Sequence, residues 1–132
     1  MARPSSHTVP VPHMVLSALR KSRRPLSAYG ILEKLKKQGV NTPPVIYRAL
    51  QKLIRDGSAH RIERLNAYVA CRCADHHTHR LSVLTICQGC DAVEELHSHA
   101  VMHHLEKLRS MGVNLPEHAV MELPVVCRRC AK

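Results

Sequence analysis

The chain has 132 residues, of which 45% are hydrophobic, 23% are charged and six are cysteine, and its net charge is +10. This length suits one ordinary domain or two small ones, and the hydrophobic content excludes a disordered chain. No apolar run reaches the ~18 residues that span a bilayer, and residues 1–12, which we expect to be flexible, lack the apolar core of a secretory signal. We therefore expect a cytoplasmic protein whose reduced cysteines are available for metal binding.

The positive charge is concentrated in the first half of the chain. Residues 1–72 hold 14 Lys and Arg against 3 Asp and Glu, which gives +11, whereas residues 73–132 hold 6 against 7, which gives −1. The basic half is expected to bind a polyanion, first of all nucleic acid. A membrane surface fits less well, because the basic residues fall on several short segments and not on one amphipathic helix. A basic surface that serves only solubility is the plain alternative.

Three short helical patterns follow one another in this basic half. The first covers residues 13–21, where apolar side chains share one face. The second begins at Ser27, a good N-cap residue, and ends near Gly39. The third follows Thr42, another N-cap residue, and has Pro43 at its first position, where the missing N–H costs nothing.

Two strand patterns, at residues 59–63 and 67–71, come after the third helix and are expected to pair as a hairpin. Three helices followed by a hairpin make a winged helix-turn-helix, the first half of the α+β fold that we predict. The polar face of the third helix has side chains suited to DNA: guanidinium groups for guanine, an ammonium group for phosphate and an amide for adenine. The candidate DNA-contacting residues there are Tyr47, Arg48, Gln51, Lys52 and Arg55.

The near-neutral half begins with a polar linker, residues 73–80, that is rich in metal-ligand side chains. Strand patterns at residues 81–86 and 119–126 each lead into a Cys-x-x-Cys pair, and a helix is expected between them over residues 98–110. The small size and apolar content of this α/β unit indicate a dimerisation domain. The predicted domains are thus a DNA-binding domain over residues 1–72, a hinge over 73–80 and a dimerisation domain over 81–132.

Two identical cysteine pairs are the most specific feature of the sequence. Cys87 and Cys90 form the first pair, Cys127 and Cys130 the second, and residues 91–126, 36 in number, separate them. Four thiolates are the tetrahedral ligand set that zinc prefers in structural sites. The pairs of a compact zinc ribbon lie only about 15–20 residues apart, so here the second pair must return from far along the chain. Two disulfides or four buried thiols are the alternatives. The lack of a secretory signal disfavours disulfides, and two Cys-x-x-Cys pairs are unlikely to occur by chance.

Histidine is abundant, with 11 residues, and several lie near Cys71 and the linker. Such a cluster at a domain junction predicts a second metal site with nitrogen, sulfur and oxygen ligands, which binds zinc less tightly than four thiolates do. Its occupancy would respond to zinc level and pH, because imidazoles must lose protons to bind. We therefore predict two Zn²⁺ per chain, one structural and one regulatory. The histidines of the cluster are His60, His76, His77 and His79.

Several segments together resemble the Fur (ferric uptake regulator) superfamily. The stretch Pro43-Pro44-Val45-Ile46-Tyr47-Arg48-Ala49-Leu50 is similar to the recognition-helix motif of that family. Ser27-Ala28-Tyr29, Gly57-Ser58-Ala59-His60, Asn66-Ala67-Tyr68-Val69-Ala70-Cys71 and Thr78-His79 are most similar to its zinc uptake regulator branch. The two cysteine pairs complete the pattern, and the resemblance runs from about residue 13 to residue 130.

The resemblance implies a homodimeric, zinc-dependent repressor of zinc-uptake genes that binds palindromic DNA when it is loaded with zinc. It assigns the four paired cysteines to the structural zinc, and Tyr29 and Arg48 to base contacts. The regulatory zinc ligands that the resemblance implies are His60, Cys71, His79 and Glu95. These four residues come from the wing, the linker and the dimerisation half, so one zinc ion bound by all of them would fix the angle between the halves.

The sequence departs from the family pattern in two places. The segment Val9-Pro10-Val11-Pro12-His13 replaces the usual Thr-Pro-Gln-Arg entry, and the usual first helix is expected to be shortened. The linker has one extra residue, which leaves His77 as an alternative to His79 and Cys73 as an alternative to Cys71. A third metal site is a further alternative, although solvated side chains are the simpler expectation. Its candidate ligands are His97, His99, His103, His104 and His118.

Other functions remain as alternatives to zinc-dependent repression. Within the same fold, the signal could be iron, manganese, peroxide or haem, but a cysteine ligand favours zinc over iron(II) and manganese, which prefer oxygen and nitrogen. A zinc hydrolase of the nucleobase-deaminase type is more remote. His104-Leu105-Glu106 and the second cysteine pair give its pattern, but the first pair and the basic half are left unexplained. A dimerisation adaptor is the third alternative. We expect no enzymatic activity, no small-molecule substrate and no membrane partner.

Overall fold

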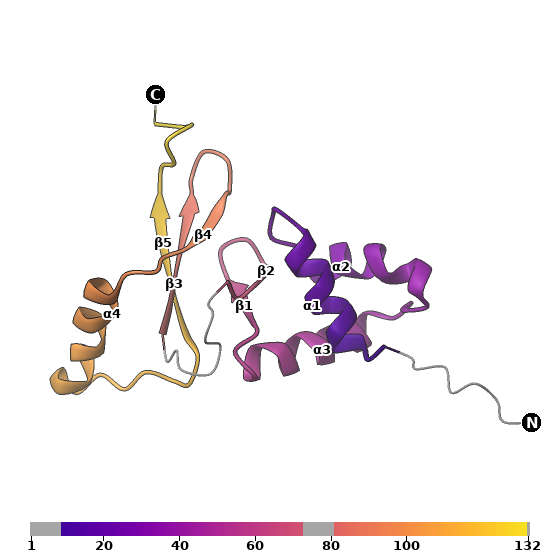
Figure 1. Cartoon of the computed structure of the whole chain (residues 1–132), viewed down its shortest axis with the longest axis horizontal. Helices are drawn as coiled ribbons and strands as arrows, with labels where there is room; N and C mark the ends of the chain where they lie inside the picture. The colour runs from indigo at the N-terminus through magenta and orange to yellow at the C-terminus, as the bar shows by residue number, and fades with distance from the viewer. Residues whose placement is uncertain (1–8, 73–80, 132) are drawn as a thin grey trace, which may run out of the picture.

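A computed structural model describes residues 9–72 and 81–131 of the chain. A helical part with a small hairpin comes first, and a part built on a three-stranded sheet follows it (Figure 1). This α+β architecture agrees with the predicted fold class. The helices are α1 (Val11–Lys21), α2 (Ala28–Leu35), η1 (Lys36–Gln38), α3 (Pro43–Arg55), α4 (His99–Glu106) and η2 (Lys107–Met111). The strands are β1 (Ala59–Ile62), β2 (Ala67–Ala70), β3 (Leu81–Cys87), β4 (Val93–Glu95) and β5 (Ala119–Val125).

The first two helices begin at local sequence signals. The start of α2 was predicted correctly, and the start of α1 was not. α2 follows Ser27, whose hydroxyl oxygen accepts a backbone N–H at 3.0 Å, as an N-cap does. α1 begins at Val11, two residues earlier than predicted, after Pro10 and with Pro12 in its first turn. The expectation that residues 1–12 lack helix is therefore wrong for Val11 and Pro12. Proline suits the first turn of a helix because no backbone partner is needed there.

α3 supplies both the core of the helical part and its exposed basic face. Pro43 is its first residue, whereas the side chain of Thr42 makes no capping hydrogen bond. The fixed φ of proline is thus the local feature that favours the helix start here. The chain leaves α3 through Gly57 at a φ of 76°, a backbone conformation that favours glycine. The side chains that α3 buries are Ile46, Ala49, Leu50 and Leu53.

Strands β1 and β2 form the wing, an antiparallel hairpin with Ala59 opposite Ala70. Each strand is one residue shorter than predicted. Asn66 takes the left-handed conformation in the turn, with a φ of 47°, which asparagine adopts more readily than most residues. Leu26 and Tyr68 exchange two backbone hydrogen bonds of 3.0 and 2.8 Å. These bonds attach the wing to the segment that precedes α2.

In the three-stranded sheet, β3 lies at the centre, antiparallel to β4 and parallel to β5. The parallel register places Cys87 opposite Val125. Parallel strands have their carboxyl ends at the same edge of a sheet. Both Cys-x-x-Cys segments, which follow these strand ends, are therefore delivered to one place.

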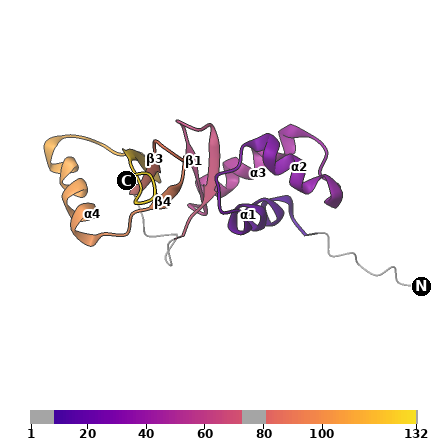
Figure 2. The same cartoon turned by 90° about the horizontal axis from the view of Figure 1, so that it is seen from above.

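The three-stranded sheet lies between α4 and the winged helix in both views of the molecule (Figure 1 and Figure 2). The helix predicted over residues 98–110 is divided into α4 and η2, and Gly112, which follows η2, has a φ of 85°. No residue of α4 is buried, although its apolar side chains share one face. No described helix has the length and apolar character needed to cross a membrane.

Two apolar clusters hold the molecule together. The first fills the winged helix between α1, α2 and α3. The second joins the wing to the three-stranded sheet, and its members are Ile62, Leu65 and Val69 of the wing with Leu84, Ile86, Val93 and Val120 of the sheet. We call the second cluster the wing–sheet contact.

Candidate metal centres and nucleic-acid interface

Four cysteine sulfurs meet at the edge where β3 and β5 end. Their Sγ atoms all lie within 4.8 Å of one another, and those of Cys90 and Cys127 are 3.8 Å apart. A zinc ion with four bonds of about 2.3 Å to thiolates places the sulfurs about 3.8 Å from each other. No disulfide is formed by the cysteines in the described part of the chain. The spacing therefore fits a four-thiolate zinc site composed of the predicted residues Cys87, Cys90, Cys127 and Cys130.

Gly89 gives the second cysteine pair room to approach the first. A Cβ atom at this position would lie 2.9 Å from Cys130 Sγ and 3.1 Å from Cys130 Cβ. The first separation is shorter than real Cβ contacts and the second is tighter than most of them, so a larger residue would displace a proposed zinc ligand or the turn. This role of Gly89 was not predicted from the sequence, although a glycine inside a Cys-x-x-Cys turn is a signal for close approach.

The thiols of this cluster differ in how readily they ionise. Cys87 Sγ accepts the backbone N–H groups of Cys127 and Gly89, each at 3.3 Å, and these bonds lower the pKa of Cys87 to about 6. Hydrogen bonds with the neighbouring thiols, that of Cys127 above all, raise the pKa of Cys130 to about 12. Four thiolates so close together repel one another. A Zn²⁺ ion bound among them would offset this repulsion, and the thiols must lose their protons to bind it.

A second cluster forms where the wing meets the sheet. It joins His60 of β1, Cys71 directly after β2 and Glu95 of β4, whose ligand atoms all lie within 4.8 Å of one another. Glu95 Oε1 is 3.7 Å from Cys71 Sγ and 3.5 Å from His60 Nε2, and the side chains of His60 and Glu95 are only 4% and 5% exposed. An imidazole, a thiol and a carboxylate that converge in a buried place suit zinc. Three of the four predicted regulatory ligands are thus together, while His79 lies outside the described residues.

His60 holds a proton strongly within this cluster. Burial on its own disfavours the charged imidazolium, but hydrogen bonds to Cys71 and Glu95 outweigh burial and raise the pKa of His60 to about 9. The imidazolium therefore balances the negative charge of the Glu95 carboxylate. A metal ion that takes this place must displace the proton, so binding and protonation are in competition.

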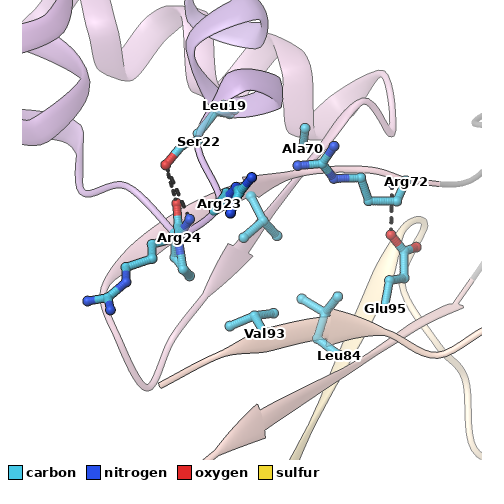
Figure 3. Close-up of a pocket in the computed structure, with 11 residues that line it drawn as sticks. Leu19, Ser22, Arg23, Arg24, Ala70, Arg72, Leu84, Val93 and Glu95 are labelled. Atoms are coloured by element: carbon cyan, nitrogen blue, oxygen red, sulfur yellow. Dashed lines mark hydrogen bonds between the residues drawn. The ribbon is translucent and has the colours of Figure 1, made fainter. Parts of the chain in front are cut away.

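Two residues that the sequence analysis missed support the cluster. Ser82 Oγ of β3 lies 3.5 Å from His60 Nε2. The backbone N–H of Arg72 donates to Glu95 Oε2 at 3.0 Å (Figure 3), and the Arg72 guanidinium donates to the carbonyl oxygen of Arg20 at 3.4 Å. Such partners orient metal ligands. Neither serine nor arginine is a residue type that a search for zinc ligands selects.

A small cavity opens beside Glu95 at the junction of the two parts (Figure 3). Its volume of ≈ 50 Å³ is far below the ~300–1,000 Å³ typical of small-molecule sites. Arg23, Arg24 and Arg72 line one side of it, and Leu84 and Val93 of the sheet line the other. The cavity is therefore a feature of the junction with room for a few water molecules.

The basic face of α3 is open to solvent. Arg48, Gln51, Lys52 and Arg55 are all exposed, on the opposite side from the buried stripe. Lys52 Nζ forms an ion pair of 3.1 Å with Asp56 Oδ2, which the sequence analysis did not foresee. Tyr29 and Tyr47 are 63% and 42% exposed. The predicted DNA-contacting residues are thus accessible.

Among the described residues, only the two clusters above bring three metal-ligand side chains within 4.8 Å. The histidines considered for a third site form no such group there, and the rings of His103 and His104 are 6.0 Å apart. Neither His104 nor Glu106 belongs to the four-cysteine cluster. The described part of the chain therefore does not assemble the deaminase pattern. His76, His77 and Cys73, the other linker residues considered as ligands, lie outside the described residues.

Comparison with known proteins gives consistent relatives, although no family model matches the chain. The chain is 36% identical over 109 residues to the zinc uptake regulation protein of Escherichia coli (strain K12), and equally to the protein of that name from Shigella flexneri. The match covers 81% of this chain and 63% of each relative, so the chain spans less than two thirds of their length.

Solved structures extend this similarity to the fold. A zinc uptake regulator complexed with zinc and DNA has a TM-score of 0.77 and 31% identity, and the match covers 94% of this chain and 83% of that one. The crystal structure of holo XcZur has a TM-score of 0.76 and 28% identity, with 94% and 86% covered. Fold and ligand clusters define a winged-helix protein with two candidate metal centres. The chain belongs to the Fur (ferric uptake regulator) superfamily, in its zinc uptake regulator branch.

Proposed function

We propose that this protein is a zinc-responsive DNA-binding repressor that controls genes of zinc uptake. The observation that carries the proposal is the cluster of His60, Cys71 and Glu95, because its ligands come from both parts of the molecule. His60 and Cys71 belong to the wing and its exit, whereas Glu95 belongs to the sheet. The relatives named as zinc uptake regulation proteins, and the solved regulator bound to zinc and DNA, support the same function.

The regulatory site acts, in this proposal, on the orientation of the winged helix. A bound zinc ion would supply bonds that join the wing to the sheet. The Cys71 thiolate and the Glu95 carboxylate neutralise the charge of a divalent cation, and His60, with His79 as the proposed fourth ligand, completes the set. The four-cysteine cluster holds the ends of β3 and β5 together at all times and serves stability.

The chemistry of the ligands favours zinc as the signal over other metals. Cys71 offers a thiolate, which suits zinc better than it suits manganese or iron(II). The separate four-thiolate cluster is a zinc set too. Sensing of iron, manganese, peroxide or haem by the same fold remains the second candidate, and the experiment below distinguishes these signals.

We propose further that the protein acts as a homodimer on palindromic DNA in the cytoplasm. β5 is an edge strand, and Leu123 and Val126 at its end are 43% and 55% exposed. None of the apolar side chains of α4 is buried. An exposed apolar strand edge and a helix with no buried residue suit contact with a second copy. Two copies related by a twofold axis would present two α3 helices to successive major grooves, about 34–36 Å apart or a multiple of that.

Selection from a random duplex DNA library tests the proposal. The purified protein is incubated at buffered high and very low free zinc, and in parallel with anaerobic Fe²⁺ and with Mn²⁺. A palindromic site enriched only at high zinc is the expected result. Equal enrichment at both zinc levels would remove zinc as the signal and retain DNA binding. No enrichment under any condition would overturn the DNA-binding function.

A further inference from the structure

The wing is covered by the sheet on one of its faces. In the wing–sheet contact, Ile62 is 0% exposed, and Leu84 and Ile86 are each 1% exposed. Leu65 in the wing turn packs against the same cluster. These residues come from both parts of the chain, so the contact exists only while the parts keep this orientation. Apolar burial stabilises it without any metal ion.

A polar contact crosses the same boundary away from the metal ligands. The backbone N–H of Arg64, in the wing turn, donates to Glu122 Oε1 of β5 at 3.4 Å. The neighbouring wing side chains Arg61 and Glu63 pair with each other at 3.3 Å. The wing turn is thus bonded to the sheet through its backbone. Glu122 lies on β5, whereas Glu95, the ligand from the sheet, lies on β4.

We propose that the wing–sheet contact and the hydrogen bond to Glu122 favour, before zinc binds, the orientation of the winged helix that the regulatory site then fixes. In this way they help to set the free zinc concentration at which the protein binds DNA. This inference rests on the proposed function. The contact keeps His60 on β1 near Glu95 on β4, so the ligands are already close before a metal ion arrives. A preorganised site needs less free metal, because less conformational freedom is lost on binding. Weakening the contact should therefore raise the zinc requirement.

Two variants weaken the contact at different points, and each has a matched control. Leu65→Ser removes apolar area from the half-buried wing turn, while Val113→Ser makes the same kind of change at an exposed loop residue that is 43% accessible. Glu122→Ala removes the acceptor of the Arg64 N–H, while Glu122→Gln keeps a carbonyl oxygen in its place. None of these residues belongs to either ligand cluster or to the basic face of α3.

The first measurement is the free zinc concentration that gives half-maximal DNA binding. The second is the rate of hydrogen exchange at the Arg64 amide, in the absence of DNA and of regulatory zinc. Leu65→Ser and Glu122→Ala are expected to need roughly fivefold more free zinc, as partial loss of apolar burial and of a preorganised state implies. Faster exchange at the Arg64 amide should accompany this change. Val113→Ser and Glu122→Gln should match the unaltered protein. A count of one tightly held zinc per chain verifies that each variant is folded.

Two results would overturn the inference. An unchanged zinc requirement in both weakened variants would mean that the contact has no part in the response. A lower requirement would mean that the contact favours an orientation that does not bind DNA. If the unaltered protein bound DNA equally with and without zinc, the proposed function would fail. The exchange experiment would still decide about the contact, because a protected Arg64 amide supports it and an unprotected amide contradicts it.

Discussion

Glu95 Oε1 lies 3.7 Å from Cys71 Sγ, although the two residues belong to different parts of the molecule. Cys71 follows the last strand of the wing, and Glu95 ends β4 of the sheet. The other oxygen of Glu95 accepts the backbone N–H of Arg72 at 3.0 Å. One carboxylate thus bonds to the winged helix and faces the candidate metal position at the same time. Loss of this carboxylate should therefore weaken both the metal response and the attachment of the wing to the sheet.

Replacement of Glu95 by alanine is predicted to abolish the zinc response at ordinary zinc levels. A ligand is lost and a buried imidazolium is left without its counter-charge. DNA binding should therefore require at least roughly 100-fold more free zinc, because even groups that only support a ligand contribute up to about that much. Fluorescence anisotropy with a selected operator, at buffered zinc, measures this. Glu94→Ala is the control, because Glu94 is exposed on the same strand. Equal behaviour of the two variants would contradict the assignment of Glu95.

The stability of the protein without regulatory zinc is predicted to fall as pH rises. The pKa of His60 is raised from 6.5 to about 9 in the folded state. A raised pKa stabilises the fold fully below about 6.5, and this contribution disappears as pH rises through about 9. The expected loss is about 3 kcal/mol, which denaturant unfolding at successive pH values should detect. His60→Gln should make the free energy of unfolding less dependent on pH. An unaltered pH dependence in that variant would show that His60 is not its cause.

The zinc affinity of the cluster of His60, Cys71 and Glu95 should rise with pH, whereas the stability of the protein without regulatory zinc should fall. The proton on His60 competes with the metal ion, so the apparent affinity is predicted to increase up to about pH 9, near the pKa of this residue. Competition with a chelator of known pH dependence measures it. Affinity that stays constant between about pH 6.5 and pH 9 would show that His60 gives up no proton on binding.

Local signals in the sequence were sufficient for much of the fold. The start of α3 at Pro43, the N-cap at Ser27 and the left-handed exit at Gly57 depend only on the conformational preferences of single residues. The repeated Cys-x-x-Cys spacing predicted that the four cysteines meet in one cluster, and their Sγ atoms do lie within 4.8 Å of one another. The proposed regulatory ligands His60, Cys71 and Glu95 were given as a set by the family resemblance, because no local spacing in the sequence connects them.

The features that the sequence left undetermined depend on contacts between distant segments. The parallel pairing of β3 with β5 and the wing–sheet contact are properties of the assembled fold. Ser82, Arg72 and Glu122 act through hydrogen bonds to groups far along the chain. Their residue types are common on protein surfaces and predict no role. The early start of α1 has a different cause, because proline can open a helix as well as break one.

The four-thiolate site is predicted to depend on Gly89. Alanine at this position would place a Cβ 2.9 Å from Cys130 Sγ, so either the ligand or the turn must move. We expect Gly89→Ala to lose its zinc to a chelator at least roughly tenfold faster and to unfold at lower temperature, because site and fold are coupled. Gln88→Ala, at the exposed neighbouring position in the same turn, should behave like the unaltered protein. Equal zinc release in both variants would rule out crowding at Gly89.

On the basic face of α3, Arg48 is predicted to contact a base and Lys52 to contact a phosphate. Arg48→Ala should cost about 1–3 kcal/mol of specific binding and relax selectivity at one base pair, if its guanidinium reads a guanine. Lys52→Ala should weaken binding to all sequences and reduce the salt dependence by about one ion. Its effect should be small, because Lys52 already pairs with Asp56 at 3.1 Å. Repeated library selection with each variant measures the change in selectivity, and operator titrations at several salt concentrations measure the affinity and its salt dependence. Arg109→Ala, at an exposed arginine of the other part, is the control. An Arg48→Ala variant that selects the same sites with unchanged affinity would exclude α3 as the recognition helix.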